Sequence, residues 1–347
     1  MQKTLKDMAK HLNNIILPEP LEIYITKPIF EDIANSEKIH EGVLAFRAFL
    51  HRFCDVLIAE GDLYDDSKKK TDEHLSAIAY KLPFFDNVKR LLFNIGVYGE
   101  LKEDATALVM RNNIFNHKLS VVKNIECLRF LTTCGLRFDG IDLNEKRQKL
   151  SEIETVIISY PDNPEMIMGL KVMAIAEKEI GTNLNHNILM RCDYRVIKND
   201  ETPVIFVLNH IMKPLSASIQ DFVLKLHQLH IDNGLNCTVD VRGFWIKIKY
   251  SRGKKEIWGI NTSLNRGFEI TVKADNVHKY AEAILKFPLV LQGIIARGHG
   301  CGKKRGISET CDAGCEGLRI PLDASILDIS DGIVTWFEQE LLCFRKK

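Results

Sequence analysis

Phe244-Trp-Ile-Lys-Ile-Lys-Tyr250 carries the clearest strand pattern of the chain, because apolar and polar side chains alternate along it. Successive side chains of a β-strand point to opposite faces of its sheet, so the alternation predicts one apolar and one polar face. We expect Phe244 and Ile246 to point into a core, and Trp245 and Lys247 to point away from it. The stretch therefore predicts a sheet that packs on a core through one face only.

Three similar stretches flank this strand, at 237–242, 256–264 and 267–273. Short turns that contain glycine separate them, and such turns join strands that pair as antiparallel hairpins. Helical patterns precede and follow the strands, at 216–233, 276–287 and 325–342. The C-terminal half is therefore predicted to be a four-stranded antiparallel sheet with flanking helices.

The N-terminal half reads mainly as helices, at 1–17, 41–60, 73–81, 84–95, 119–134 and 164–180. Short strand patterns interrupt them, at 136–141, 154–160 and 188–198. The stretch Asn199-Asp-Glu-Thr-Pro203 is polar and linker-like, so we place a domain boundary there. The predicted class is α+β, with a mainly helical α+β domain over 1–200 and an antiparallel-sheet domain over 201–347.

The composition is that of a globular protein, with 46% hydrophobic and 27% charged residues among 347. No apolar run approaches the ~20 residues that a membrane span needs, and the first residues lack the apolar core of a signal peptide. We therefore expect a cytoplasmic protein. Six of the nine cysteines are scattered and are expected to pack as small hydrophobic residues: Cys54, Cys127, Cys134, Cys192, Cys237 and Cys343.

The other three cysteines lie in a glycine-rich stretch near the C-terminus. Together with one histidine they could supply the four ligands of a structural zinc ion: His299, Cys301, Cys311 and Cys315. The spacing differs from the common C-x-x-C knuckles, so a disulfide or a metal-free loop of reduced cysteines remains an alternative. A nucleophilic Cys301 with His299 as its base is a further, enzymatic alternative, and it lacks a defined orienting group.

Cations in the same stretch suggest a site for an anion. Lys303, Lys304 and Arg305 stand between glycines, whose backbone N–H groups could also face an oxyanion. The spacing is not that of a phosphate-binding G-x-x-x-x-G-K-[ST] loop. Residues 242–305 contain fourteen Lys and Arg against four Asp and Glu, a balance of +10 that also suggests nucleic-acid binding.

The polar face of the predicted sheet is the third candidate site. Its expected ligand-facing residues are Arg242, Trp245, Lys247 and Lys249. A tryptophan among cations could stack on a planar anionic ligand or on a nucleobase. The alternative is a solvated face on which Trp245 is covered by another part of the chain.

The C-terminal half, about residues 215–342, resembles bacterial α+β proteins of unknown function that are built as helix, antiparallel meander and helix. Phe244-Trp-Ile-Lys-Ile-Lys-Tyr250, Trp258-Gly-Ile260, Gly267-Phe-Glu-Ile-Thr-Val-Lys273 and the cysteine loop carry this resemblance. Small-molecule-sensing domains related to DNA gyrase inhibitors have a similar layout, which suggests ligand binding by analogy. We expect a non-enzymatic protein that binds an anionic small molecule, with zinc in the cysteine loop; nucleic-acid binding is the alternative.

Overall fold

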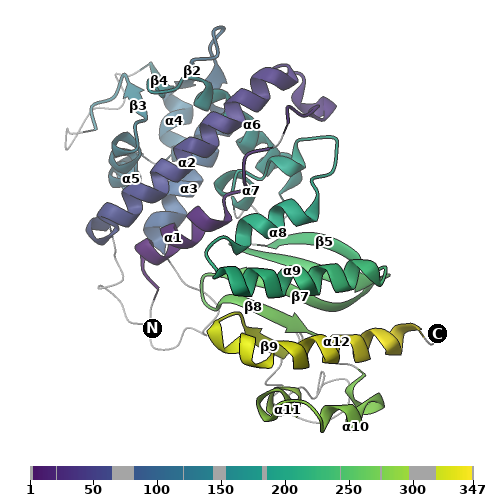
Figure 1. Cartoon of the computed structure of the whole chain (residues 1–347). Helices are drawn as coiled ribbons and strands as arrows, with labels where there is room; N and C mark the ends of the chain where they lie inside the picture. The colour runs from purple at the N-terminus through teal and green to yellow at the C-terminus, as the bar shows by residue number, and fades with distance from the viewer. Residues whose placement is uncertain are drawn as a thin grey trace, which may run out of the picture. The chain divides into compact units, whose positions relative to one another are not determined.

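The computed structural model describes residues 3–20, 22–64, 82–119, 121–143, 154–181, 186–242, 244–273, 276–296 and 318–345. The chain forms two compact units, Met1–Thr202 (unit 1) and Pro203–Lys347 (unit 2), and their division falls within the stretch 199–203 (Figure 1). Helices and antiparallel sheets occur in both units, so the predicted α+β class is confirmed. No helix in the described ranges has the length and apolar composition needed to cross a membrane.

Two long helices form the centre of unit 1. These are α2 (Ser36–Tyr64) and α6 (Glu165–Ile180), and they approach each other closely at Gly42 and Gly169. A Cβ atom added to Gly169 would lie 1.9 Å from the carbonyl oxygen of Gly42, so only glycine allows this spacing. Around them lie α1 (Leu5–Ile15), α3 (Pro83–Tyr98), α4 (Asn112–Leu119) and α5 (Val121–Thr133).

The sheet of unit 1 is small and antiparallel, with the strand order β1-β2-β4-β3. Its strands are β1 (Glu100–Leu101), β2 (Ala107–Arg111), β3 (Arg137–Asp139) and β4 (Thr155–Ser159). Buried Leu108 and Met110 alternate with less buried residues on β2, and Val156 and Ile158 do so on β4. The unit therefore buries one face of this sheet.

The strand predicted at 188–198 is wrong. The segment forms a short helix, α7 (Asn187–Met190), and a 3-10 helix, η4 (Tyr194–Val196). Its only strand-like contact among the described residues is an isolated bridge between Thr26 and Lys198. Short helical turns, rather than a sheet, bury the apolar residues of the segment. A short run of apolar residues in the sequence does not distinguish a buried strand from buried helical turns.

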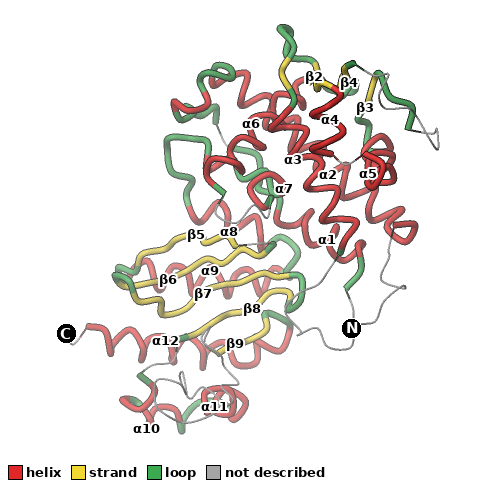
Figure 2. The backbone as a smooth tube through the Cα atoms, turned by 180° about the vertical axis from the view of Figure 1, so that it is seen from behind, coloured by secondary structure: helices red, strands yellow, loops and turns green. Residues whose placement is uncertain are grey.

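Unit 2 contains a meander of five antiparallel strands in the order β5-β6-β7-β8-β9 (Figure 2). The strands are β5 (Asn236–Arg242), β6 (Trp245–Arg252), β7 (Lys255–Ser263), β8 (Gly267–Val272) and β9 (Leu318–Pro321). A two-residue turn joins β6 to β7, and Gly253 has the positive φ of 58° that such turns favour. The fifth strand, β9, was not predicted, and it pairs with β8 from Val272↔Leu318 to Glu269↔Pro321.

Helices cover one face of this sheet. In Figure 1, α9 (Ala217–Asp232) and α12 (Ser330–Arg345) lie in front of the strands, and in Figure 2 the strands lie in front of α9. The central side chains of the helix-covered face are fully buried: Ile246, Ile248, Tyr250, Trp258, Ile260, Ile270 and Val272. The period-two prediction of an apolar face is therefore correct for the centre of the sheet. The remaining long helix of the unit is α8 (Val204–Met212).

Two local predictions in unit 2 differ from the structure. Phe244 is half-buried and lies in the turn before β6, so it does not belong to the core. The helix predicted at 276–287 is broken into η5 (Val277–Lys279) and α10 (Ala281–Ile284), and α11 (Leu289–Ala296) follows. Buried Glu340 of α12 holds the start of this segment, because it accepts hydrogen bonds from the Asn276 side chain and from the Tyr280 hydroxyl.

A histidine is buried between the sheet and its helices. His230 of α9 has no exposed surface, and its ring lies 4.6 Å from Trp258 and 5.3 Å from Phe337, centre to centre. Nδ1 lies 2.7 Å from the Leu226 carbonyl oxygen, so Nδ1 carries the proton and donates it. Burial lowers the pKa of His230 to about 4, because the charged ring would lose its hydration.

This lowered pKa predicts acid sensitivity of unit 2. In the unfolded chain this histidine has the ordinary pKa of 6.5. Between pH 6.5 and about 4 it is therefore protonated in the unfolded chain and neutral in the folded chain. We therefore expect His230 to lower the free energy of unfolding by up to about 1.4 kcal/mol per pH unit as the pH falls through this window. Tryptophan fluorescence during urea unfolding follows unit 2, because Trp245, Trp258 and Trp336 all belong to it. His230→Leu should remove this part of the pH dependence, and a variant of exposed His278 should keep it.

Candidate functional site

The polar face of the unit 2 sheet, opposite to α9 and α12, carries a central row of hydrogen-bonding side chains. From β5 to β8 the strand register places opposite one another Asp240, Lys247, Asn261 and Glu269. Opposed side chains have Cβ atoms about 4.5–5.5 Å apart, so neighbours in the row can contact each other. Lys247, Asn261 and Glu269 expose only 7%, 7% and 4% of their surfaces. Such residues are seldom buried without partners, so their contacts describe the site.

Three cations of the polar face pair with carboxylates. The pairs are Lys249 with Asp240, Lys247 Nζ with Glu256 Oε1 at 2.6 Å, and Arg319 Nη1 with Glu269 Oε1 at 2.6 Å. Lys249 and Asp240 keep 26% and 20% of their side chains exposed, whereas Lys247 keeps 8%. The predicted ligand-facing lysines are therefore partly or largely buried ion-pair members rather than solvated side chains.

A glycine in β7 makes room for the Lys247 side chain. A Cβ atom at Gly259 would lie 2.9 Å from Cε of Lys247 and 2.7 Å from the carbonyl oxygen of Ile248. The aliphatic part of Lys247 therefore lies across Gly259 and brings its ammonium group to Glu256. A register shift between Tyr250 and Ser251 locally changes the pairing of the strands beside this contact.

Asn261 has one hydrogen-bonding group without a partner. Its Nδ2 donates to Glu269 Oε1 at 2.8 Å, which fixes the orientation of the amide because an ionised carboxylate only accepts. Its Oδ1 is buried and accepts no hydrogen bond within the described part of the chain. The neighbouring Lys247 ammonium group lies 2.6 Å from Glu256 Oε1 and makes no hydrogen bond to Oδ1 of Asn261. The row therefore contains an unused acceptor between a cation and a carboxylate.

Burial raises the pKa of Glu269 above its ordinary value of 4.5, and the hydrogen bond from Asn261 offsets this effect only in part. The folded chain thus holds a proton on Glu269 more tightly than the unfolded chain does. The stability that follows from this is present below pH 4.5 and is lost as the pH rises through the raised pKa. At neutral pH the charged form is held at a cost, which is typical of functional sites.

We therefore expect Glu269→Gln to leave the free energy of unfolding at pH 7 within about 1 kcal/mol of wild type, or above it, because the uncharged amide avoids the desolvation cost of the buried carboxylate. Glutamine keeps an acceptor for Asn261, and half-buried Arg319 can turn towards water. Relative to the variant, the wild type should lose stability between pH 4 and pH 7 in urea unfolding. A loss of several kcal/mol at pH 7 would show that the carboxylate is a structural group.

The remaining predicted ligand-facing residues lie at one end of this face. Trp245 is half-buried and pairs with Ser263 of β7 and with Arg242 of β5. Strand register places Arg242 on the same face, and its side chain lies outside the described part. The structure thus brings Trp245, Lys247 and Lys249 onto one surface. Sequence reasoning missed the ion-pair partners Glu256 and Arg319. Glu256 could have been proposed, because it is an acidic residue in the strand next to that of Lys247.

The two other candidate sites lie outside the described residues. These are the zinc ligands His299, Cys301, Cys311 and Cys315 and the anion-binding cations Lys303, Lys304 and Arg305. In the ranges that the structure does describe, no group of three or more His, Cys, Asp or Glu side chains could hold a metal ion.

The six scattered cysteines are free thiols. Four of them are buried, at Cys54, Cys127, Cys134 and Cys192, and Cys237 and Cys343 are half-buried. Burial raises the pKa of both Cys127 and Cys134 to about 12. A thiol at neutral pH is a poor nucleophile, so these residues act as packing groups.

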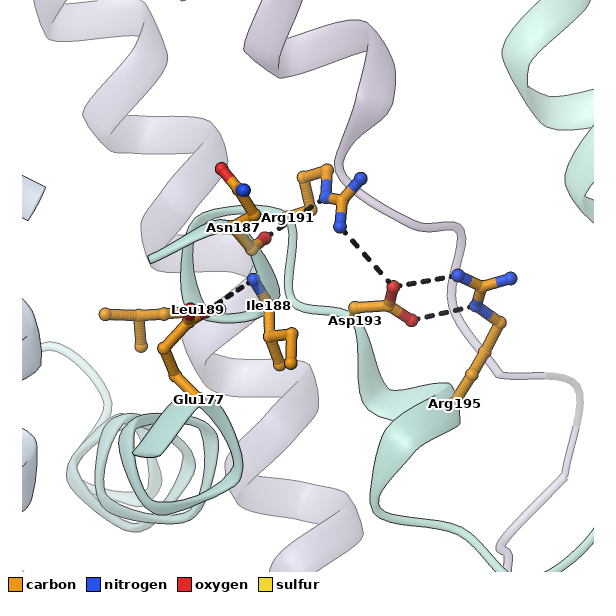
Figure 3. A network of polar contacts seen from close by, with 7 residues as sticks. All are labelled: Glu177, Asn187, Ile188, Leu189, Arg191, Asp193 and Arg195. Atoms are coloured by element: carbon orange, nitrogen blue, oxygen red, sulfur yellow. Dashed lines mark hydrogen bonds and ion pairs between the residues drawn. The ribbon is translucent and has the colours of Figure 1, made fainter. Parts of the chain in front are cut away.

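Unit 1 contains a buried network that sequence reasoning missed (Figure 3). The carboxylate of Glu177, at the end of α6, accepts hydrogen bonds from the backbone N–H groups of Ile188 and Leu189 at 2.6 and 3.1 Å. Asp193 accepts two hydrogen bonds from Arg195, both at 2.8 Å, and lies 3.7 Å from Nη2 of Arg191.

This network has the features of a structural element. It combines two carboxylates with two guanidinium groups, and Asp193 and Arg191 expose only 3% and 2% of their surfaces. The backbone that it holds includes two non-glycine residues with positive φ, His186 at 58° and Cys192 at 49°. We infer that the network stabilises this unusual backbone.

The candidate functional site is therefore the polar face of the unit 2 sheet, with paired charges and one unused acceptor at its centre. Comparison with known proteins adds no family to this description: no protein-family model, no curated protein and no solved structure matches the chain.

Proposed function

We propose that unit 2 is a non-enzymatic binding module for a small molecule with an anionic group, and that the polar face is its binding surface. The observation that carries the proposal is the grouping of half-buried Trp245 with Lys247 and Lys249 on one sheet face. A tryptophan ring offers a stacking surface to a planar ligand, and the ammonium groups attract its anionic group. Small-molecule sites combine such an apolar surface with a few fixed polar groups.

The anionic group would compete with a carboxylate that already belongs to the protein. The pair between Lys249 and Asp240 is the easier one to exchange, because both side chains remain partly exposed. A ligand carboxylate that takes the place of Asp240 exchanges one ion pair for another, and the released Asp240 side chain can be hydrated. Lys247 lies deeper and adds a second cation beside the first.

The nucleic-acid alternative has less support from the same contacts. Nucleic-acid surfaces present cations that are available to many phosphates. On the polar face, Lys247, Lys249 and Arg319 each have a carboxylate partner. A small ligand that replaces one partner fits this arrangement better than a polyanion does.

Titration with 3-phenylpropionate, an anionic probe with one planar ring, tests the proposal. Trp258 and Trp336 have no exposed surface, so a change of fluorescence on binding reports Trp245. We expect saturable binding that Lys247→Gln and Lys249→Gln each weaken at least about fivefold, since one charge-assisted contact is worth about 1 kcal/mol or more. Lys254→Gln, at an exposed turn position, is the matched control and should bind as wild type.

The absence of saturable binding would overturn the proposal. Binding of a single-stranded oligonucleotide that falls steeply with salt and is weakened by the same two variants would favour the nucleic-acid alternative instead.

The zinc loop is a second part of this proposal and is tested by elemental analysis of the purified, untagged chain. We expect one equivalent of zinc, which Cys311→Ser should abolish because it removes one of the four ligands. Cys127→Ser should keep the metal, because Cys127 is a buried packing residue. A metal-free chain whose loop cysteines all react with a thiol reagent would contradict this part alone.

A further inference from the structure

The central row of the polar face carries both signs of charge on neighbouring strands. Lys247 lies on one side of Asn261, and Glu269 lies on the other, each directly opposite to it in the sheet. Neighbouring strands are about 4.8 Å apart, so the backbone positions of Lys247 and Glu269 flank that of Asn261 at about that spacing, while the Lys247 ammonium group reaches Glu256. A ligand that itself carries two groups of opposite charge would pair with both, in exchange for Glu256 and beside Arg319.

The unused acceptor of Asn261 points to a donor on the ligand. Oδ1 is buried without a partner, and a carbonyl oxygen left in this state costs about as much as a lost hydrogen bond. The opposite end of the same amide is occupied by Glu269, so the amide cannot turn over to satisfy its oxygen without losing that contact. Only a group that brings an N–H or O–H into the space beside Oδ1 completes it.

The carboxylate of Glu269 places a negative charge next to the Asn261 side chain. Its contacts with Asn261, Arg319 and, at 4.0 Å, Arg266 all fall on Oε1, and a carboxylate offers about four acceptor positions in all. An ammonium group has three donors and could satisfy Oδ1 of Asn261 and the carboxylate of Glu269 together. A neutral hydroxyl group would donate a hydrogen bond to Oδ1 of Asn261 but would gain no charge attraction from the carboxylate of Glu269.

Resting on the proposed function, we infer that the ligand of the polar face is a zwitterion of the α-amino acid class. Its ammonium group binds between Asn261 Oδ1 and Glu269, and its carboxylate binds Lys247 or Lys249. The side chain of such a ligand then extends along the face towards Trp245, which accounts for an aromatic surface beside the charged row.

Three probes with one phenyl group test this assignment on the wild-type chain. 3-Phenylpropionate has only the carboxylate, phenethylamine has only the ammonium group, and phenylalanine has both. Followed through Trp245 fluorescence, phenylalanine should bind at least about tenfold more tightly than either of the other two, because only it fills both halves of the row.

Asn261→Leu, of similar size, should remove the tenfold advantage of phenylalanine and leave 3-phenylpropionate binding unchanged. Asn236→Leu makes the same change at an exposed position at the start of β5 and should bind all probes as wild type. The comparison of the three probes needs no variant, so it stands even where a variant fails to fold.

The outcomes separate the two proposals. Equal binding of phenylalanine and 3-phenylpropionate would overturn the zwitterion and leave the anion-binding function standing. Binding of phenethylamine alone, or of no probe, would overturn the proposed function, and the zwitterion with it.

Discussion

Gly169→Ala should lower the free energy of unfolding of unit 1 by about 3 kcal/mol or more, at or above the upper end of the usual effect of overpacking. The added methyl group would lie 1.9 Å from the carbonyl oxygen of Gly42 and 2.6 Å from Cβ of Phe46. Both neighbours are fixed parts of α2, so the helices α2 and α6 must separate along their main contact. Far-UV circular dichroism during urea unfolding measures the change.

Gly61→Ala is the matched control, because it makes the same substitution within α2. The added methyl group would meet the Lys6 side chain at 3.1 Å, and that side chain can move. Alanine is also the better helix former by about 1 kcal/mol. We therefore expect a stability equal to wild type or higher, and equal losses from the two variants would show that the helices are not in this close contact.

Asp193→Asn should cost unit 1 about 3–5 kcal/mol, because it removes the counter-ion of two guanidinium groups. Arg191 is almost fully buried, and burial already lowers its pKa to about 10 although Asp193 opposes this effect. Without the carboxylate, the buried charge keeps its hydrogen bond to the Asn187 carbonyl oxygen and the attraction of the Glu177 carboxylate, but loses its ion pair. Urea unfolding followed by circular dichroism again gives the size of the loss.

Asp200→Asn provides the comparison for this second variant. Asp200 pairs with Lys198 at 2.8 Å, but 62% of its side chain is exposed to water. A pair of this kind is worth about 0–1 kcal/mol, so the control should unfold close to wild type. If Asp193→Asn were as mild as this control, the network of Figure 3 would have no structural role.

The sheet of unit 2 could be predicted from the sequence because its strands follow a local rule. Period-two alternation places Ile246, Ile248 and Tyr250 on one face, and short turns pair consecutive strands. Strand β9 escaped the prediction, since four residues carry too little alternation and their partner β8 lies far back in the chain. Local patterns therefore predict local pairings and miss the distant one.

The misassigned segment 188–198 shows a different limit. Its conformation depends on Glu177, which belongs to the preceding helix and caps the backbone of Ile188 and Leu189. It depends also on Asp193, because a turn of the backbone brings Arg191 and Arg195 to its carboxylate, and no periodic sequence pattern marks these contacts. Such tertiary contacts override local propensity and leave no periodic pattern to read.

The candidate site could be predicted only in outline. Alternation placed Trp245, Lys247 and Lys249 on one face, which the register confirms as a shared surface. The partners of the lysines were not predictable from the sequence. Lys247 reaches Glu256 only because Gly259, on the neighbouring strand, has no side chain in its path, and this requires the strand register to be known. The unused oxygen of Asn261 follows from the position of Glu269 on the next strand, a contact that no single-strand pattern contains.

The late position of β9 in the chain has a consequence for the order of folding. A few residues close each hairpin from β6 to β8, whereas about 45 residues separate Val272 from its partner Leu318. The entropic cost of closing a loop grows by about 0.6 kcal/mol per doubling of its length. Pairing β9 with β8 therefore carries a loop-closure cost about 2–3 kcal/mol higher than closing a hairpin does. We expect the meander β5–β8 to form first and β9 to add last.

Until β9 adds, β8 is an unpaired edge that another chain could extend. Natural sheets discourage such pairing by placing charged side chains on the exposed edge. In that interval Glu269 is the charge that β8 carries, and Arg319, its later partner, is not yet beside it. The carboxylate that costs stability in the finished sheet would thus protect the unfinished sheet from aggregation.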